Sequence, residues 1–275
     1  KRQRNIHTKN FMWTTNFNFA YNNNKILKEA LREDALEPGR EGYPVGALFA
    51  LKTAGLDEEG YPMFEGKDGK AVSAMEFFKL QEWGFGATDL TARERRELYT
   101  YVGTADCPYT GGFNNTFTYK AFELGVNFSF DFGGKVRSQP TYSIVDFDKG
   151  RNTNRDILNR WTPENTETIF PVLLSQNERL DEYMWYSNQN EIYRNLDIWI
   201  RDLNYVRLQN IRLGYTLPTN FSRKLGMTSA TIAIEGRNLL VFGSSYKNYL
   251  DPETMSNAYA TPAPKSVTLS LNLNF

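Results

Sequence analysis

The sequence has a single cysteine, Cys107, and a single histidine, His7, among its 275 residues. One cysteine excludes an internal disulfide and a zinc site built from several thiolates. One histidine means that any catalytic triad or histidine-based metal site would depend on that one ring. The sequence therefore argues against most nucleophilic and metal-dependent enzymes.

The sequence also has no net charge and no long apolar run. The 32 lysine and arginine residues balance 32 aspartate and glutamate residues. A protein that binds nucleic acid needs surplus positive charge to displace counterions from phosphates, so we expect no nucleic acid partner. The sequence contains no run of about 18 apolar residues, which excludes a transmembrane helix. Residues 1–5 lack the apolar core of a signal peptide.

Aromatic residues, in contrast, are abundant: they make up 15% of a chain whose mean hydropathy is −0.55. Apolar and polar residues alternate over segments of about ten residues, which is the period of a β-strand. In 122–132, the clearest example, Phe, Leu and Val share one face, while Glu, Gly, Asn, Ser and Asp share the other. The same alternation occurs in 11–21 and 267–275.

The alternation predicts an all-β chain with about seven antiparallel strands. We place them at 11–21, 45–51, 112–119, 122–132, 204–217, 230–237 and 267–275. Within 204–217 the alternation changes phase, which predicts a β-bulge near Asn210. Lys120 and Ala121 form a hairpin-sized turn. Segments 25–32 and 220–225 have the pattern of short helices, and 71–96 that of a mostly helical insertion.

Long and shorter connections alternate between these strands. The long ones are at about 56–110, 133–197 and 243–265. In a series of hairpins this places every long loop at one end of the sheet, as in outer-membrane barrels with long extracellular loops and short periplasmic turns. The chain then begins at an extracellular turn that contains His7. A soluble β-sandwich also shows alternation, but its polar face would typically carry more charge than the Asn, Ser, Thr and Gly found here.

Several segments resemble motifs of the SusC/RagA-type TonB-dependent outer-membrane transporters. Segment 202–218, DLNYVRLQNIRLGYTLP, resembles the family signature VRLxNIxLGYTLP. Four other segments resemble family motifs in the same order along the chain: YTGGFNNTFTYKAF at 109–122, RWTPEN at 160–165, GRNLL at 236–240 and DPE at 251–253. The resemblance extends over essentially the whole chain.

The resemblance implies a transmembrane antiparallel β-barrel of 22 strands, of which residues 1–275 form about seven. Seven strands alone would leave two edges with unpaired backbone groups in lipid. We therefore expect the chain to be the C-terminal portion of a larger protein whose plug domain is absent from it. The implied function is TonB-dependent active import of a nutrient oligomer, preferably a glycan, otherwise a peptide. The alternative is an outer-membrane barrel or surface protein that binds glycan without energised transport.

The resemblance also implies a location and partners. The location is the outer membrane of a Gram-negative bacterium of the Bacteroidota type, with outer-membrane lipid around the barrel. A SusD-like surface lipoprotein would cover the extracellular loops, the TonB–ExbB–ExbD complex would act through the missing plug, and two such SusCD pairs could form a dimer. The assembly machinery would read the last strand, where Leu273 and Phe275 match the family signal and Ser270 replaces its usual Gly.

Two groups of candidate site residues follow from the strands and loops. Parity along the strands assigns four charged residues to the lumen: Arg207, Arg212, Glu235 and Arg237. Aromatic residues around the second long loop could stack on sugar rings, or could instead pack the loop or contact the lipoprotein. These are Tyr183, Trp185, Tyr186 and Trp199.

We expect no catalytic residue, no metal ligand and no cofactor. Adjacent carboxylates such as Glu58 and Glu59 lie together in a loop, without the two different environments that the carboxylates of a glycosidase need. The calcium loop of many family members is reduced here to Asp68-Gly69. Phe64 and Gly66 stand where a hard cation would need oxygen ligands.

Overall fold

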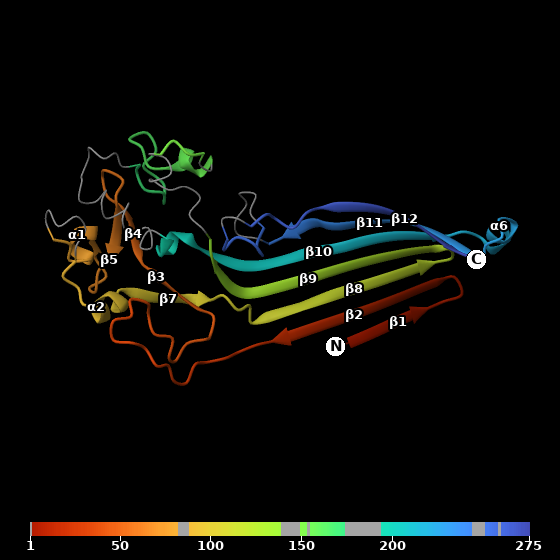
Figure 1. Ribbon diagram of the computed structural model, residues 1–275, viewed down its shortest axis with the longest axis horizontal. Helices are drawn as coiled ribbons and strands as arrows, with labels where there is room; N and C mark the ends of the chain where they lie inside the picture. Colours follow the sequence, from red (N-terminus) through yellow and green to blue (C-terminus); the bar gives the residue numbers. More distant parts are fainter. Residues whose placement is uncertain are drawn as a thin grey trace.

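The computed structural model describes residues 2–81, 88–138, 149–152, 155–173, 194–243, 251–257 and 260–275. Its main feature is one long antiparallel sheet, with the long connections gathered at one end (Figure 1). The sheet has seven strands in the order β1-β2-β8-β9-β10-β11-β12. Their bounds are Arg2–His7, Phe11–Tyr21, Tyr109–Tyr119, Phe122–Arg137, Ile200–Thr216, Ser229–Phe242 and Ser266–Asn274.

The number of strands agrees with the sequence prediction, but two of the assignments differ. His7, expected in a turn, is the last residue of β1 and pairs with Met12 on β2. β1 runs toward the end of the sheet that carries the short turns, so the prediction of an extracellular turn at the start of the chain is wrong (Figure 1). The predicted strand at 45–51 does not join this sheet, because β3 (Ala47–Leu51) pairs with β7 (Tyr99–Thr104) in a separate sheet.

Cross-strand pairing divides the seven-stranded sheet into an apolar face and a polar face. A row of directly paired side chains crosses the apolar face from β2 to β12: Trp13, Phe117, Leu124, Leu213, Ile234 and Leu269. Many residues of this face are exposed, including Phe19 at 52% and Leu271 at 60%. An exposed apolar face of this extent is typical of a surface that contacts lipid.

The predicted irregularity and the predicted tight connections are confirmed. The register of β10 shifts between Leu208 and Asn210 against both of its neighbours, as a β-bulge requires. Lys120 adopts a positive φ of 53° in the turn between β8 and β9. Helix α6 (Thr219–Lys224) forms the connection between β10 and β11 at the same end of the sheet (Figure 1).

At the opposite end, the connection between β2 and β8 folds into a small unit, which we call the loop unit. Besides β3 and β7 it contains β4 (Thr53–Leu56), β5 (Pro62–Glu65) and β6 (Ala71–Val72) and helices α1 (Ala74–Phe77) and α2 (Ala92–Glu97). The connection between β9 and β10 adds the 3₁₀ helices η1 (Arg155–Asn159) and η2 (Asp197–Trp199). Both connections share one core, formed by Leu51, Tyr61, Phe64, Ala74, Phe78, Leu196 and Trp199.

Local signals account for only part of the loop unit. Thr91 and Glu94 form a capping box that begins α2, since each side chain accepts a hydrogen bond from the other residue's backbone N–H. The predicted helix at 25–32 is not formed, and the described parts of 71–96 hold a strand and two short helices instead of a mostly helical insertion. No helix in the described part of the chain is long and apolar enough to cross a membrane.

Candidate functional site

The four residues predicted to face the lumen lie together on the polar face of the sheet. Arg212 on β10 is directly opposite Glu235 on β11, and Arg237 is opposite Asn210. Arg207 is opposite Ser129 on β9, and the register shift brings it to the same face as Arg212. The bulge therefore decides which face these residues share, because strict alternation would place Arg207 and Arg212 on opposite faces.

Most of these charged side chains form exposed pairs. Arg212 Nη1 lies 3.2 Å from Glu123 Oε1, and the two side chains are 32% and 51% exposed. Arg237 Nε lies 2.7 Å from Glu235 Oε1. Exposed pairs of this kind contribute little to stability, because water solvates the separated charges almost as well. This part of the polar face therefore carries charged groups that are at least partly exposed.

Arg207 is different because its side chain is buried, with 2% exposure, beneath residues 251–257. Its guanidinium donates hydrogen bonds to Asp251 and to Glu253 Oε1, the latter over 2.9 Å. Tyr205, two residues earlier on β10, donates to Asp131 over 2.6 Å, and its hydroxyl lies 3.1 Å from Glu253 Oε1. These contacts anchor the segment 251–257 to the polar face of β9 and β10.

Asp251 also organises its own segment. Its carboxylate accepts hydrogen bonds from the backbone N–H of Glu253 at 3.0 Å and of Ala263 at 3.3 Å. Burial by itself raises the pKa of Asp251, but the hydrogen bonds from Arg207 and from these N–H groups outweigh it and hold the pKa below its ordinary value. The carboxylate consequently remains ionised and paired with Arg207.

Of the four aromatic candidates around the second long loop, the structure describes Trp199. Trp199 is 0% exposed and lies in the core of the loop unit, with its ring centroid 5.9 Å from that of Phe170. It has no surface to offer a sugar ring, so the structure contradicts its role as a ligand contact and supports the alternative, packing of the loop. Tyr183, Trp185 and Tyr186 lie outside the described residues.

The two residues of the expected assembly signal lie at the end of β12. Leu273 is paired with Ala230 on β11 and is 42% exposed. Phe275 follows the strand and is 85% exposed. Both side chains are accessible to a partner, and their role in assembly stays a prediction.

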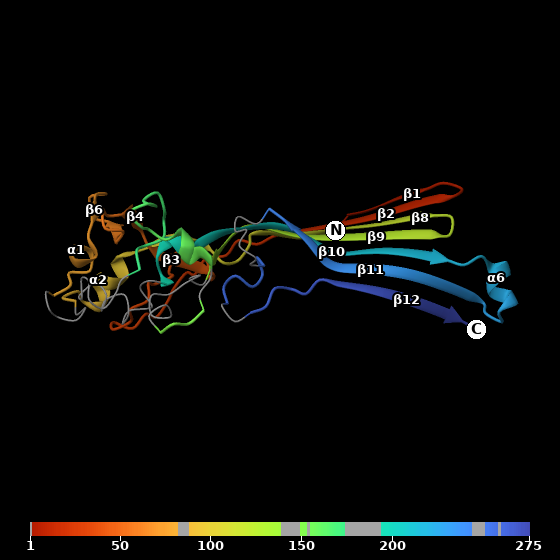
Figure 2. The same cartoon turned by 90° about the horizontal axis from the view of Figure 1, so that it is seen from above.

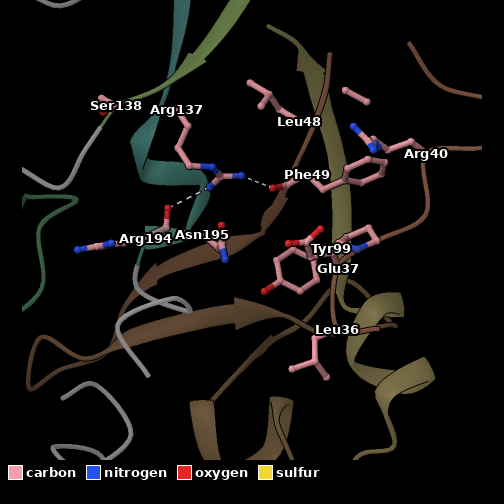
Figure 3. A pocket seen from close by; sticks show the side chains of 12 residues that line it. Leu36, Glu37, Arg40, Leu48, Phe49, Tyr99, Arg137, Ser138, Arg194 and Asn195 are labelled. Atoms are coloured by element: carbon pink, nitrogen blue, oxygen red, sulfur yellow. Dashed lines mark hydrogen bonds between the residues drawn. The ribbon is translucent and has the colours of Figure 1, made fainter. Parts of the chain in front are cut away.

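A cavity of about 580 Å³ lies at the junction of the sheet and the loop unit (Figure 3). We call it the loop cavity. Its described lining comes from five parts of the chain: 36–40, 47–49 of β3, Tyr99 of β7, 137–138 at the end of β9, and 194–195. Its volume is within the usual range of pockets for small ligands.

Arg137 is the central polar group of the loop cavity. Its Nη1 donates to the carbonyl of Arg194 over 3.0 Å, and its Nη2 donates to the carbonyl of Phe49. In Figure 3 these two bonds hold the guanidinium between Arg194 and Phe49, and Asn195, Glu37 and Tyr99 lie around the same space. The cavity thus combines the fixed guanidinium of Arg137 with two further arginines, Arg40 and Arg194, and with polar and aromatic side chains.

Sequence reasoning missed Tyr205 and Arg137. A signal for Tyr205 was present, because it belongs to the same motif as Arg207, and the acidic DPE motif at 251–253 supplies a complementary charge. Arg137 had no such signal, because it lies beyond the alternating part of its strand and its partners are main-chain carbonyls from distant segments.

No family model matches the sequence. Two TonB-dependent receptors of Formosa agariphila, named P3 and P39, are 27% and 23% identical to the chain over 99% and 98% of its length. The chain spans 28% and 29% of these relatives, less than a third of either. A structure of the RagAB peptide transporter matches the fold with a TM-score of 0.69 and a sequence identity of 21%. A structure of the RagAB peptide importer in the open-open state matches with a TM-score of 0.67 and a sequence identity of 20%. Each match covers 99% of this chain and 28% of the chain in the solved structure.

The motif segments and the shared fold coincide in the same strands. Segments 109–122 and 202–218 contain β8 and β10, which lie inside the sheet that resembles the RagAB structures. The relatives found by sequence match 98–99% of this chain, and they are named TonB-dependent receptors. In its motifs, its fold and its relatives, the chain therefore resembles part of the β-barrel of a SusC/RagA-type TonB-dependent transporter.

Proposed function

We propose that the complete protein imports a nutrient oligomer across the outer membrane in a TonB-dependent process, and that residues 1–275 supply part of its barrel wall. The supporting observation is the two-faced sheet, apolar on one side and polar on the other. Figure 2 shows its strands following one another as a twisted wall, with the loop unit at one end. Such a wall separates lipid from an aqueous lumen.

In this arrangement the polar face lines the lumen. Arg212, Glu235 and Arg237 would then be accessible to a passing ligand, while Arg207 holds residues 251–257 against the inner wall. Because this segment is folded onto the polar face, it narrows the lumen near the end that carries the long connections. The segment would therefore shape the path that a ligand takes.

The substrate that we propose is an oligosaccharide. Side chains with planar polar groups and aromatic rings, which suit hydroxyl groups and sugar rings, line the loop cavity. The specific alternative is a peptide, since the solved structures that share the fold are named as peptide importers. A direct comparison of both ligand classes decides between them.

We also propose a SusD-like surface lipoprotein as a partner over the long connections, with TonB–ExbB–ExbD as the source of energy and a dimer of two SusCD pairs in the outer membrane. Exposed apolar side chains in the long connections support a protein partner there, because such groups are costly to leave in water. They include Leu27 at 85%, Leu158 at 70% and Ile169 at 51% exposure.

Uptake by cells that make the full-length protein tests the proposal. Fluorescent oligosaccharides and oligopeptides of matched length are offered to these cells and to a deletion strain, with and without a protonophore. We expect protein-dependent uptake of oligosaccharide that the protonophore abolishes. Uptake of the peptides alone would overturn the choice of glycan. Surface binding that the protonophore leaves unchanged, without uptake, would support a glycan-binding protein and refute energised import.

A further inference from the structure

The loop cavity has walls that are fixed by hydrogen bonds. On one side, Arg96 of α2 holds the chain before residue 36, because its Nη1 donates to the carbonyls of Glu33 at 2.9 Å and Ala35 at 2.5 Å. Arg40 closes the same wall through an ion pair with Glu29, at 3.5 Å. This wall is therefore tied both to α2 and to its own neighbouring residues.

The opposite wall is tied to the core of the loop unit. The backbone N–H of Leu51 donates to the carbonyl of Asn195 over 2.8 Å. Ser138, which is 1% exposed, donates its hydroxyl to the carbonyl of Trp199 over 2.9 Å. Since Leu51 and Trp199 are themselves buried in that core, Asn195 and Arg137 are held in place before any ligand arrives.

The charge of Arg137 is not balanced by a carboxylate within the described part of the chain. Its hydrogen bonds go to two neutral main-chain carbonyls. A guanidinium has five N–H donors in a planar fork, so three remain after these two bonds. Two further arginines belong to the described lining: Arg40, which is paired with Glu29, and Arg194; Glu37 is its acidic residue. The described lining thus carries more positive than negative charge, and the guanidinium of Arg137 is held in it by neutral carbonyls.

The same cavity presents rings and further polar groups. Phe49 is held by edge contacts with Tyr43 and Tyr101, at centroid distances of 5.1 and 5.9 Å. Figure 3 shows Tyr99, Glu37 and Asn195 around the same space. Binding sites for small ring-shaped ligands are usually lined by aromatic side chains together with a few polar groups that orient the ligand.

We infer that the loop cavity is a binding site for an acidic saccharide, in which Arg137 binds the carboxylate or sulfate of a sugar ring and Phe49 and Tyr99 line the apolar wall. An oxyanion supplies the charge that the cavity lacks, and a planar guanidinium matches it in a bidentate way. The saccharide class rests on the proposed function, whereas the anion preference rests on Arg137. The inference deepens that function by naming the substrate class.

Binding to the purified full-length protein, measured by calorimetry, tests this site. The ligands are an oligogalacturonate, a sulfated oligosaccharide, a neutral oligosaccharide of equal length and an oligoglutamate peptide. We expect the wild-type protein to bind at least one acidic saccharide at least about tenfold more tightly than the neutral one, since charge-assisted bidentate contacts are strong. Comparison of the oligogalacturonate with the sulfated oligosaccharide shows whether carboxylate or sulfate is the preferred anion.

Three variants separate the site from general effects on the fold. Arg137→Gln should reduce the acidic preference to about twofold or less, as one charge is lost. Leu48→Trp keeps Arg137 but fills the cavity, so it should weaken the binding of acidic saccharide even if Arg137→Gln fails to fold. Arg93→Gln removes an equal charge from the exposed face of α2, where Arg93 pairs with Glu97, and should leave binding unchanged.

The inference is overturned if Leu48→Trp or a folded Arg137→Gln binds acidic saccharide like the wild type, or if oligoglutamate binds as tightly as the acidic saccharides. These outcomes are distinct from failure of the proposed function. Energised uptake without any effect of Arg137→Gln would refute this site alone. Binding of acidic saccharide that depends on Arg137, without protonophore-sensitive uptake, would refute import and retain the site.

Discussion

Replacing Arg207 by methionine should release residues 251–257 from the polar face of the sheet. The side chains of Arg207 and Asp251 are 2% and 6% exposed, so the variant leaves a buried carboxylate without its counter-charge. Breaking a buried pair in this way costs about 3–5 kcal/mol. The contact with Glu253, whose side chain is 44% exposed, adds less than about 1 kcal/mol. The loss cannot exceed the free energy that attaches the segment, because a detached Asp251 is solvated by water.

Hydrogen exchange of the full-length protein measures this loss directly. The N–H groups of Glu253 and Ala263 donate to Asp251, so they are protected only while the segment is attached. A loss of about 3 kcal/mol accelerates their exchange by roughly a hundredfold, since each 1.4 kcal/mol corresponds to a factor of ten. Mass spectrometry of peptides from 251–263 would report this change while peptides from β10 remain protected.

Two comparison variants make the prediction specific. Arg212→Met removes an arginine from the same strand and face, but its pair with Glu123 is exposed, so exchange of 251–257 should remain unchanged. The double variant Arg207→Met with Asp251→Asn removes both charges but keeps a side-chain oxygen that can accept the N–H groups of Glu253 and Ala263, so it should recover part of the protection. Unchanged exchange in Arg207→Met would refute the anchoring role. A double variant no better protected than the single one would refute the electrostatic explanation.

Three further predictions concern the same sheet. The contacts of Asp251 hold its pKa below the ordinary value of 3.8. The attachment of residues 251–257 should therefore be equally strong from neutral pH down to about that value, and it should be lost as the pH falls through the lowered pKa. Hydrogen exchange corrected for intrinsic rates would measure this loss. Gly111→Val should lower the thermal midpoint of the purified protein, since a side chain there would overlap a main-chain oxygen of β2 and a phenylalanine ring of β9, whereas Gly125→Val has open space and should not. Ile234→Lys on the apolar face should cost up to about 2–4 kcal/mol and reduce the amount assembled in the outer membrane, while Thr231→Lys on the polar face should have little effect.

Each of these predictions has a contradicting outcome. Loss of protection already well above pH 3.8 would mean that the contacts of Asp251 do not stabilise its ionised form. Equal thermal midpoints for the two glycine variants would show that β2 and β8 do not approach each other as closely at Gly111. Normal assembly of Ile234→Lys would argue that the apolar face does not contact lipid.

The strands that alternate in sequence are the ones that sequence reasoning predicted correctly. β9 and β12 alternate because each of their faces meets a different environment, and this pattern is local. β1 lacks such a pattern, with the sequence RQRNIH, and its assignment comes from pairing with β2. Residues 45–51 do alternate, yet the strand there belongs to a different sheet, because alternation does not specify the partner strand.

The site divides in the same way. Parity and the bulge at Asn210 predicted that the four charged residues share one face. Burial of Arg207 could not be predicted by this reasoning, because residues 44 and 46 positions later in the chain cover it. Trp199 illustrates the converse case: an aromatic residue beside a long loop is a candidate ligand contact until the core that encloses it is known.

By itself, the sequence determined the all-β fold class, the strands with one apolar and one polar face, and the family-like motifs. These features depend on residue order within about ten positions and on the environment of each strand face. Only the tertiary structure decided that Arg207 is an anchor and that Arg137 faces a cavity. Both roles arise from contacts between segments that lie far apart in the chain, and the partners that each arginine meets depend on how the long connections fold back onto the sheet.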